Sequence, residues 1–206
     1  MSTSRGQIDN RRRILDTARP IFASKGFSAV GLSEILTSAK VPKGSFYHYF
    51  ASKEAFGEAL LEEYFAGYLA RVEAILSSSR GRAADRVLRF CEDWSAAYVN
   101  GDVEDQCLVV QLGAEVSDLS DRMRAILREG TSRVIGILAR CLDEGLRDGS
   151  VRGVQSATDT ATALYQLWLG ATLLSKFTRN GQPFDVAMES TRRQLGLPPS
   201  VTKPAS

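Results

Sequence analysis

The sequence of 206 residues has little of the chemistry that enzymes and metal sites need. It contains one histidine and three scattered cysteines, too few for a cluster of zinc ligands. We find no catalytic set of His, Cys and Asp, and no glycine-rich phosphate loop. The sequence therefore predicts no metal site, no cofactor and no enzymatic activity.

Long apolar runs are also missing. No segment approaches the ~20 apolar residues of a membrane-spanning helix, and the first 13 residues are polar and basic. These features predict neither a membrane span nor a secretory signal. An odd number of cysteines, too few for a disulfide framework, favours a reducing compartment. We therefore expect a cytoplasmic protein.

Segments with the period of a β-strand are absent too, and apolar residues recur at helical spacing along most of the chain. Gly26 ends the first helical pattern, and the segment 77–81 breaks a longer pattern that Ser52 caps. A serine at 156 with Asp159 three residues on resembles a capping box. The sequence thus predicts an all-α protein. The patterns lie at residues 14–22, 32–39, 42–50, 56–69, 87–98, 123–141, 161–174 and 186–195.

The charges are unevenly distributed. Residues 1–53 contain nine Lys or Arg against three Asp or Glu, whereas the remainder contains 17 basic and 21 acidic residues. A basic N-terminal part on an acidic body suggests a polyanion-binding module joined to a second module with another role. A solvated basic surface is the alternative on charge alone.

The most informative stretch is residues 26–55, GFSAVGLSEILTSAKVPKGSFYHYFASKEA. It predicts a helix, a tight turn at 38–41, and a short helix that buries Phe46 and Phe50. A helix of two turns is unstable alone, so these rings must pack on neighbouring helices. The other side offers ammonium, hydroxyl, phenol and imidazole groups. Such a set suits phosphates and base edges in the major groove of DNA.

The run GSFYHYFASKE from Gly44 to Glu54 resembles the helix-turn-helix of the TetR family of regulators. The arginine-rich segment before it and the sequence Lys-Gly-Phe at 25–27 also fit that family. Two positions depart from the usual pattern. Gly31 stands where a capping Ser or Thr is common, and Lys40 stands where a turn glycine is common, at a possible left-handed position.

The resemblance implies a TetR-like architecture and its partners. A DNA-binding domain would span residues 8–68, with the helix-turn-helix at about 31–50. A domain for effector binding and dimerisation would span 69–197, followed by a flexible tail at 198–206. The expected partners are a palindromic double-stranded DNA operator, a small-molecule effector and a second copy of the chain. The homodimer would form through the last two long helices, within 156–195, with close approach at Ala161, Gly170, Ala171 and Met188.

The candidate DNA-contacting residues share the free side of the short helix and its flanks. Gly44 allows close approach of the backbone to a phosphate. A lysine in the first turn of a helix is unfavourable for the helix dipole, and a nearby phosphate would offset this at position 53. The candidates are Lys40, Lys43, Gly44, Ser45, Tyr47, His48 and Lys53.

A second run, DQCLVVQLGAEVSDLS at 105–120, resembles a narrower TetR subgroup. This subgroup is typified by the repressor of N-ethylmaleimide reductase and the regulator of acrylate utilisation. The similarity extends to residues 42–61 and 174–177. It implies a repressor that answers reactive electrophiles or small unsaturated acids and controls enzymes that reduce or detoxify them.

Cys107 is the candidate sensing thiol, because it follows a break at 100–102 and so lies near a helix N-terminus, which favours the thiolate. Lys176 is the only lysine between Lys53 and Lys203. It is the candidate cation that polarises this thiol or holds a carboxylate ligand. Cys91 and Cys141 lie on apolar stripes, where a buried packing role is expected.

Two alternatives remain open at this point. The first is an effector that is a flat hydrophobe or an acid, bound without covalent chemistry by an aromatic pocket. A DNA-binding dimer that needs no ligand is the second alternative. The pocket candidates are Trp94, Tyr98, Tyr165 and Trp168.

Overall fold

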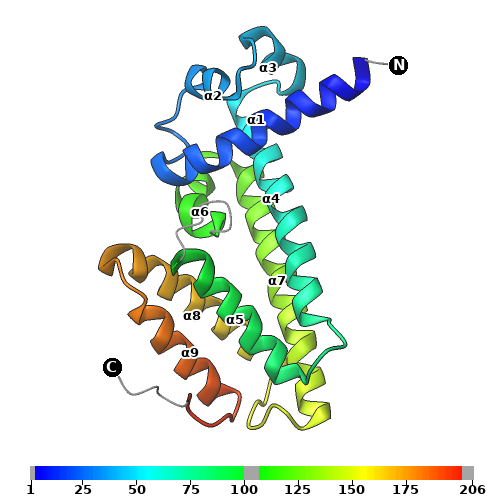
Figure 1. Cartoon of the computed structure of the whole chain (residues 1–206), viewed down its shortest axis with the longest axis vertical. Coiled ribbons are helices and arrows are strands. Elements are labelled where there is room, and N and C mark those ends of the chain that lie inside the picture. Colours follow the sequence, from blue (N-terminus) through cyan, green and yellow to red (C-terminus); the bar gives the residue numbers. More distant parts are fainter. Residues whose placement is uncertain (1–2, 100–106, 201–206) are drawn as a thin grey trace. The chain divides into compact units, whose positions relative to one another are not determined.

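A computed structural model describes residues 3–99 and 107–200 of the chain, and this part contains nine α-helices and no strand (Figure 1). The all-α prediction is confirmed. None of the described helices combines the length and the apolar character needed to span a bilayer. The helices are α1 (Thr3–Lys25), α2 (Leu32–Ala39), α3 (Lys43–Tyr49), α4 (Lys53–Leu76), α5 (Ala83–Val99), α6 (Leu108–Leu119), α7 (Asp121–Asp148), α8 (Ala157–Thr178) and α9 (Gln182–Gln194).

The helix boundaries follow from local sequence. Gly26 adopts φ +87° directly after α1, and the Ser52 hydroxyl accepts the N–H of Ala55 at 3.0 Å to begin α4. The Ser156 hydroxyl accepts the N–H of Asp159 at 3.2 Å and caps α8. These three end signals were predicted from the sequence, and all three are confirmed. The predicted break at 100–102 lies outside the described residues.

The chain forms two compact units. Unit 1 comprises residues 1–67 and 103–130, and unit 2 comprises 68–102 and 131–206. By packing, α6 and the first part of α7 group with the N-terminal helices, while the division by role into a DNA-binding domain at 8–68 and a C-terminal domain at 69–197 stays a prediction. The physical reason is packing, because Met123 of α7 is buried and lies with Phe27 over Gly57 of α4.

An aromatic cluster holds the short helix α3 in unit 1. Phe46 and Phe50 are buried, as predicted, and their rings contact Phe56 of α4 at centroid distances of 5.4 and 4.8 Å. Phe56 in turn contacts Phe22 of α1 at 5.9 Å. Because α3 has only 7 residues, this tertiary packing supplies the stability that so short a helix lacks.

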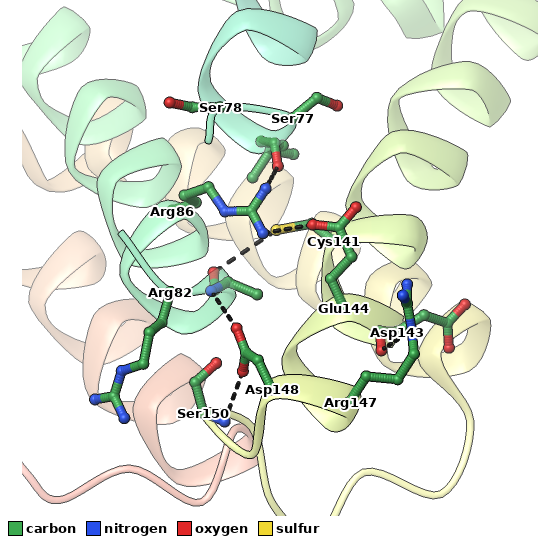
Figure 2. A network of polar contacts seen from close by, with 12 residues as sticks. Ser77, Ser78, Arg82, Arg86, Cys141, Asp143, Glu144, Arg147, Asp148 and Ser150 are labelled. Atoms are coloured by element: carbon green, nitrogen blue, oxygen red, sulfur yellow. Dashed lines mark hydrogen bonds and ion pairs between the residues drawn. The ribbon is translucent and has the colours of Figure 1, made fainter. Parts of the chain in front are cut away.

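In unit 2, α5, α8 and α9 pack side by side (Figure 1), and a polar network fixes the start of α5 (Figure 2). The guanidinium of Arg86 donates to the carbonyl of Leu76 and to the carboxylate of Glu144, both at 2.5 Å. Asp148 and Ser150 accept the N–H groups of Ala83 and Ala84, each at 3.1 Å. They satisfy donors that the first turn of a helix leaves without intrahelical partners.

Candidate functional site

The helix-turn-helix is formed by α2 and α3, and its turn has an uncommon residue. Lys40 adopts φ 54°, the left-handed conformation expected from its position. The N–H groups of Val41 and Lys40 donate to the carbonyls of Leu36 and Thr37 at 3.0 and 3.1 Å. This is the Schellman pattern, which usually has glycine at the left-handed position. Lysine here adds a positive charge to the turn at a conformational cost of about 1 kcal/mol.

The start of α2 confirms the second departure from the usual pattern. Gly31 is the N-cap, and no side-chain hydrogen bond caps this helix. The residue has an extended conformation, with φ −82° and ψ 148°. Any contact from this position to DNA must therefore come from the backbone, since glycine brings no hydroxyl.

The α3 residues sort into a buried and an exposed side. Lys43, Gly44, Tyr47 and His48 are exposed, and the exposed fraction of Tyr47 is 55%. Ser45 is half-buried. The rings of Tyr47 and Phe46 are nearly perpendicular, with their centroids 5.4 Å apart. This side of α3 presents the polar groups that the sequence assigned to DNA, next to Lys40.

Unlike the exposed candidates on α3, Lys53 contacts the turn between α1 and α2. Its ammonium donates to the carbonyl of Ser28 at 3.3 Å and lies 4.9 Å from the centre of the Phe27 ring. Burial lowers the pKa of Lys53, and the charge of Glu115 partly offsets this. A shallow hollow of about 350 Å³ is lined by Phe27, Ser28, Lys53, Glu54, Leu119 and Met123. The side chain thus stabilises the turn between α1 and α2 as well as adding charge near α3.

Glu115 of α6 holds that same turn. Its carboxylate accepts the N–H groups of Phe27 and Ser28 at 2.8 and 2.7 Å. Burial raises the pKa of Glu115, but hydrogen bonds from the side chain and N–H of Ser28 and from the N–H of Phe27, with the charge of Lys53, outweigh it and hold the pKa below its ordinary value. A carboxylate bonded to two backbone N–H groups is a strong charge-assisted contact. Glu115 was not singled out from the sequence, because its partners lie 87 and 88 positions away.

Cys107 is the N-cap of α6, as its predicted place near a helix N-terminus requires. The residue is 4% exposed, and the hydroxyl of Tyr64 donates to Sγ at 3.6 Å. The expected rise in thiolate fraction is wrong for this conformation, since burial raises the pKa of Cys107. The helix N–H groups, Tyr64 and Arg19 act in the opposite direction and do not outweigh burial. The sequence could locate the helix end but could not show the depth of the sulfur.

Two family profiles match the chain. The profile of the bacterial regulatory proteins of the tetR family matches residues 14–60, and that of the tetracyclin repressor-like C-terminal domain matches 83–191. The chain belongs to the TetR family. It is a transcriptional repressor of the TetR type, as the sequence predicted, and its relatives are regulators rather than enzymes.

The repressor is similar to NemR of Escherichia coli K12, an HTH-type transcriptional repressor, with 38% identity over 92% of this chain and 96% of NemR. The repressor DhaR of Mycobacterium sp. GP1 is 31% identical, over 85% and 86% of the two chains. The regulator AcuR of Cereibacter sphaeroides is 37% identical, over 77% and 73%. A crystal structure of E. coli NemR in its reduced form superposes with a TM-score of 0.87, at 39% identity, over 92% and 98%. The predicted subgroup resemblance is thereby confirmed.

Lys176 of the repressor lies in unit 2, near the end of α8, whereas Cys107 lies in unit 1. The lysine is exposed, and partial burial lowers its pKa. Its expected roles toward the thiol or a carboxylate stay predictions.

The four aromatic pocket candidates pack mainly on one another and on α9. The indole N–H groups of Trp94 and Trp168 donate to the hydroxyls of Thr172 and Thr191 at 2.9 and 3.0 Å. The ring of Trp94 meets that of Tyr165 at 5.6 Å, and Tyr98 meets Phe184 at 5.7 Å. This arrangement is that of a packed core, so a ligand here would have to displace existing contacts.

Two of the residues expected at the dimer interface are buried inside the subunit. Ala161 and Ala171 are 0% and 5% exposed within one subunit, so they pack inside the subunit instead of facing a partner. Met188 is half-buried, and Gly170 is exposed, with no atom within 4 Å of the position that a Cβ would take. Large apolar side chains are exposed instead near the end of α8 and the start of α9: Leu173, Leu174, Phe177 and Val186.

Proposed function

We propose that the repressor controls genes for enzymes that reduce or detoxify reactive electrophiles or small unsaturated acids, and that modification of Cys107 by such a compound releases its operator. The observation that carries this proposal is the position of Cys107 at the start of α6, the helix whose Glu115 holds the turn before α2. The similarity to NemR, which has a structure described as its reduced form, supports a thiol as the sensing group.

The chemical step is a conjugate addition. The sulfur of Cys107 attacks the β-carbon of an activated C=C bond, a C–S bond forms, and the π electrons move to the α-carbon. The thiol proton ends on the α-carbon, so the addition needs no oxidant and releases no leaving group. The thiolate is the reacting form, and burial makes it scarce in the described conformation.

Release follows from the volume of the adduct. Cys107 is 4% exposed, and close-packed interiors do not accept added atoms without movement. The adduct therefore favours a conformation in which the start of α6 is displaced, and Glu115 passes that displacement to the turn that precedes α2. The effector shifts the population away from the DNA-binding state because it is compatible only with the other state.

Mapping by mass spectrometry tests this proposal. After a brief, substoichiometric dose of N-ethylmaleimide, the first label should lie on Cys107, and operator binding should fall in proportion. The Cys107→Ser variant should bind operator normally and ignore the electrophile, while Cys91→Ser and Cys141→Ser respond like the parent. First labelling at Cys91 or Cys141, or release of the Cys107→Ser variant, would contradict the proposal. A Cys107→Ser variant that still answers acrylate favours the non-covalent alternative, with Lys176 as the carboxylate anchor.

For DNA, we propose that α3 of each subunit of a homodimer reads one half of a palindromic operator. The half-sites would then lie about 34–36 Å apart, or a multiple of this. The exposed apolar residues at the end of α8 and the start of α9 support a dimer there. A monomer in light scattering at micromolar concentration would contradict this assembly.

Salt titrations of operator binding test the individual lysines. Lys43→Ala should weaken binding to all DNA sequences and reduce the salt slope by about one, the loss of one phosphate contact. Lys53→Ala should also reduce the slope if its ammonium leaves Ser28 for a phosphate in the complex. An unchanged slope for Lys53→Ala removes that residue from the interface and leaves it a role in the turn.

A further inference from the structure

Three helices of unit 1 bring an arginine, a tyrosine and the candidate sensing thiol together. The guanidinium carbon of Arg19, on α1, lies 5.2 Å from the centre of the Tyr64 ring on α4. The Tyr64 hydroxyl donates to Sγ of Cys107 at 3.6 Å. The contact between Tyr64 and Cys107 joins residues 43 positions apart in the sequence. The three side chains form a chain of contacts that ends at the sulfur.

Arg19 lacks acceptors for part of its guanidinium. Its Nε and Nη2 atoms are buried and have no hydrogen-bond partner in the described part of the chain. A buried charged donor without an acceptor costs free energy, so natural proteins rarely leave one without a reason. The cost falls when negative charge develops nearby, because the guanidinium then gains an electrostatic partner. The reacting sulfur of Cys107 is a group beside this cluster on which such charge develops.

We propose that Arg19 is a positioning residue for Cys107: it holds the Tyr64 ring so that the phenol donates to Sγ, and its charge supports the sulfur as it reacts. This inference rests on the proposed function of Cys107. A cation over an aromatic face is attracted by the ring electrons. It also draws electron density from the ring, which strengthens the O–H group as a donor, as in polarised hydrogen-bond chains.

The surroundings of Cys107 agree with this role. Burial raises the pKa of the thiol, and the groups that oppose burial are the N–H groups of Val109 and Val110, the Tyr64 hydroxyl and the charge of Arg19. The two amides belong to α6 itself, whereas Tyr64 and Arg19 reach the sulfur from α4 and α1. Arg19 is the cation among these groups. The sequence had assigned that role to Lys176, on the ground that lysines are scarce in the middle of the chain.

The pH profile of the modification rate tests the inference. The rate of N-ethylmaleimide addition at Cys107 is followed by mass spectrometry from pH 6 to 11 in full-length protein. In Arg19→Met and in Tyr64→Phe, the midpoint should rise by about one pH unit, which corresponds to a rate about tenfold lower at pH 7. Arg19→Lys keeps the charge but loses the planar guanidinium over the ring, so its midpoint should lie between those of the parent and Arg19→Met. The double variant should fall short of the product of the two single effects, because Arg19 acts through Tyr64.

Arg12→Met is the matched control, since Arg12 is exposed on the same helix and pairs with Asp16 at 3.7 Å. Its midpoint should equal that of the parent. A parent midpoint in Arg19→Met overturns the inference while the proposed function stands. If Arg19→Met does not fold, as judged by circular dichroism, Tyr64→Phe decides in its place, and an unchanged midpoint there overturns the inference. A parent protein that is not labelled at Cys107 contradicts the proposed function instead.

Discussion

Each compact unit buries a cysteine beside an arginine, and the two arginines are used differently. In unit 2, Arg86 is 6% exposed and donates to Leu76 and Glu144 (Figure 2). The Sγ of Cys141 donates to the Ala83 carbonyl at 3.6 Å. In unit 1, Arg19 leaves two buried nitrogen atoms, Nε and Nη2, without acceptors, whereas Arg86 leaves Nε alone. The sulfur of Cys107 accepts a hydrogen bond from Tyr64.

A nearby cation does not by itself keep the pKa of a buried thiol low, since burial raises the pKa of both Cys107 and Cys141. A thiol that donates its proton to a carbonyl is stabilised in the neutral form, and burial raises the pKa of Cys141 to about 11 despite Arg86. A sulfur that accepts from a phenol is stabilised as the thiolate. Burial also raises the pKa of Cys91. Of the two cysteines beside an arginine, only Cys107 is shown accepting a phenolic donor in the described structure.

The largest expected contrast concerns the two arginines. Arg86→Met should lower the free energy of unfolding by about 2–3 kcal/mol, because it removes charged hydrogen bonds to a buried carbonyl and to Glu144. Arg19→Met should cost less than about 1 kcal/mol, since it removes a partly unsatisfied cation along with its contact to a ring. Urea unfolding followed by circular dichroism measures both. Equal losses would break the distinction between a structural and a functional arginine.

A second contrast concerns carboxylates that accept backbone N–H groups, Glu115 in unit 1 and Asp148 in unit 2. Hydrogen bonds from Ser150 and Ala83 lower the pKa of Asp148, as those from Ser28 and Phe27 do for Glu115. A carboxyl whose folded pKa is lowered stabilises the fold fully above its unfolded pKa. The contribution is lost as the pH falls through the folded value. Glu115→Gln should therefore cost about 1–2 kcal/mol at pH 7 and flatten the acid limb of the stability profile.

Operator binding should distinguish the two carboxylate variants. Glu115→Gln should also weaken operator binding, because the turn before α2 loses its anchor on α6, whereas Asp148→Asn should leave operator affinity as in the parent. Stability against pH and operator titrations at pH 7 provide the two readouts. Normal DNA affinity in Glu115→Gln would show that α6 does not support the helix-turn-helix through this contact.

The smallest expected contrast concerns two non-glycine residues in the left-handed conformation, Lys40 in unit 1 and Arg179 in unit 2, with φ 54° and 52°. Replacing either with glycine should stabilise the protein by about 0.5–1 kcal/mol, because glycine adopts this conformation without steric cost. Lys40→Gly should at the same time reduce the salt slope of operator binding, and Arg179→Gly should not. Thermal unfolding and salt titration report these effects. A parent slope in Lys40→Gly would place that lysine outside the interface.

The sequence was informative wherever the cause of a structure is local. The cap at Ser52 and a short helix within 42–50 follow from neighbouring residues, and the structure has both, with α3 at Lys43–Tyr49. The cap at Gly31 and the left-handed Lys40 were expected from the family pattern, and the structure has them too. The family motif added the assignment of α3 to DNA.

What the sequence could not provide depends on contacts between distant positions. Nothing near Arg19 indicates that its guanidinium lies over a ring at position 64, and nothing near Glu115 indicates its bonds to Phe27 and Ser28. The pKa direction of Cys107 was wrong because a helix N-terminus is visible in the sequence whereas burial is not. Ala161 was placed at a dimer face because small residues allow close approach, and here they allow it inside one subunit.

The contact of Glu115 also provides an observable of the state of the repressor. The amide hydrogens of Phe27 and Ser28 lie between α1 and α2, and both are bonded to this one carboxylate. Amides outside helices exchange with solvent rapidly unless such a bond protects them. The exchange rates of these two hydrogens therefore measure how often the hydrogen bonds between Glu115 of α6 and the turn before α2 break. Measured by NMR with and without an electrophile, these rates show whether the electrophile breaks the contact between α6 and the turn before α2. No DNA is needed in the sample.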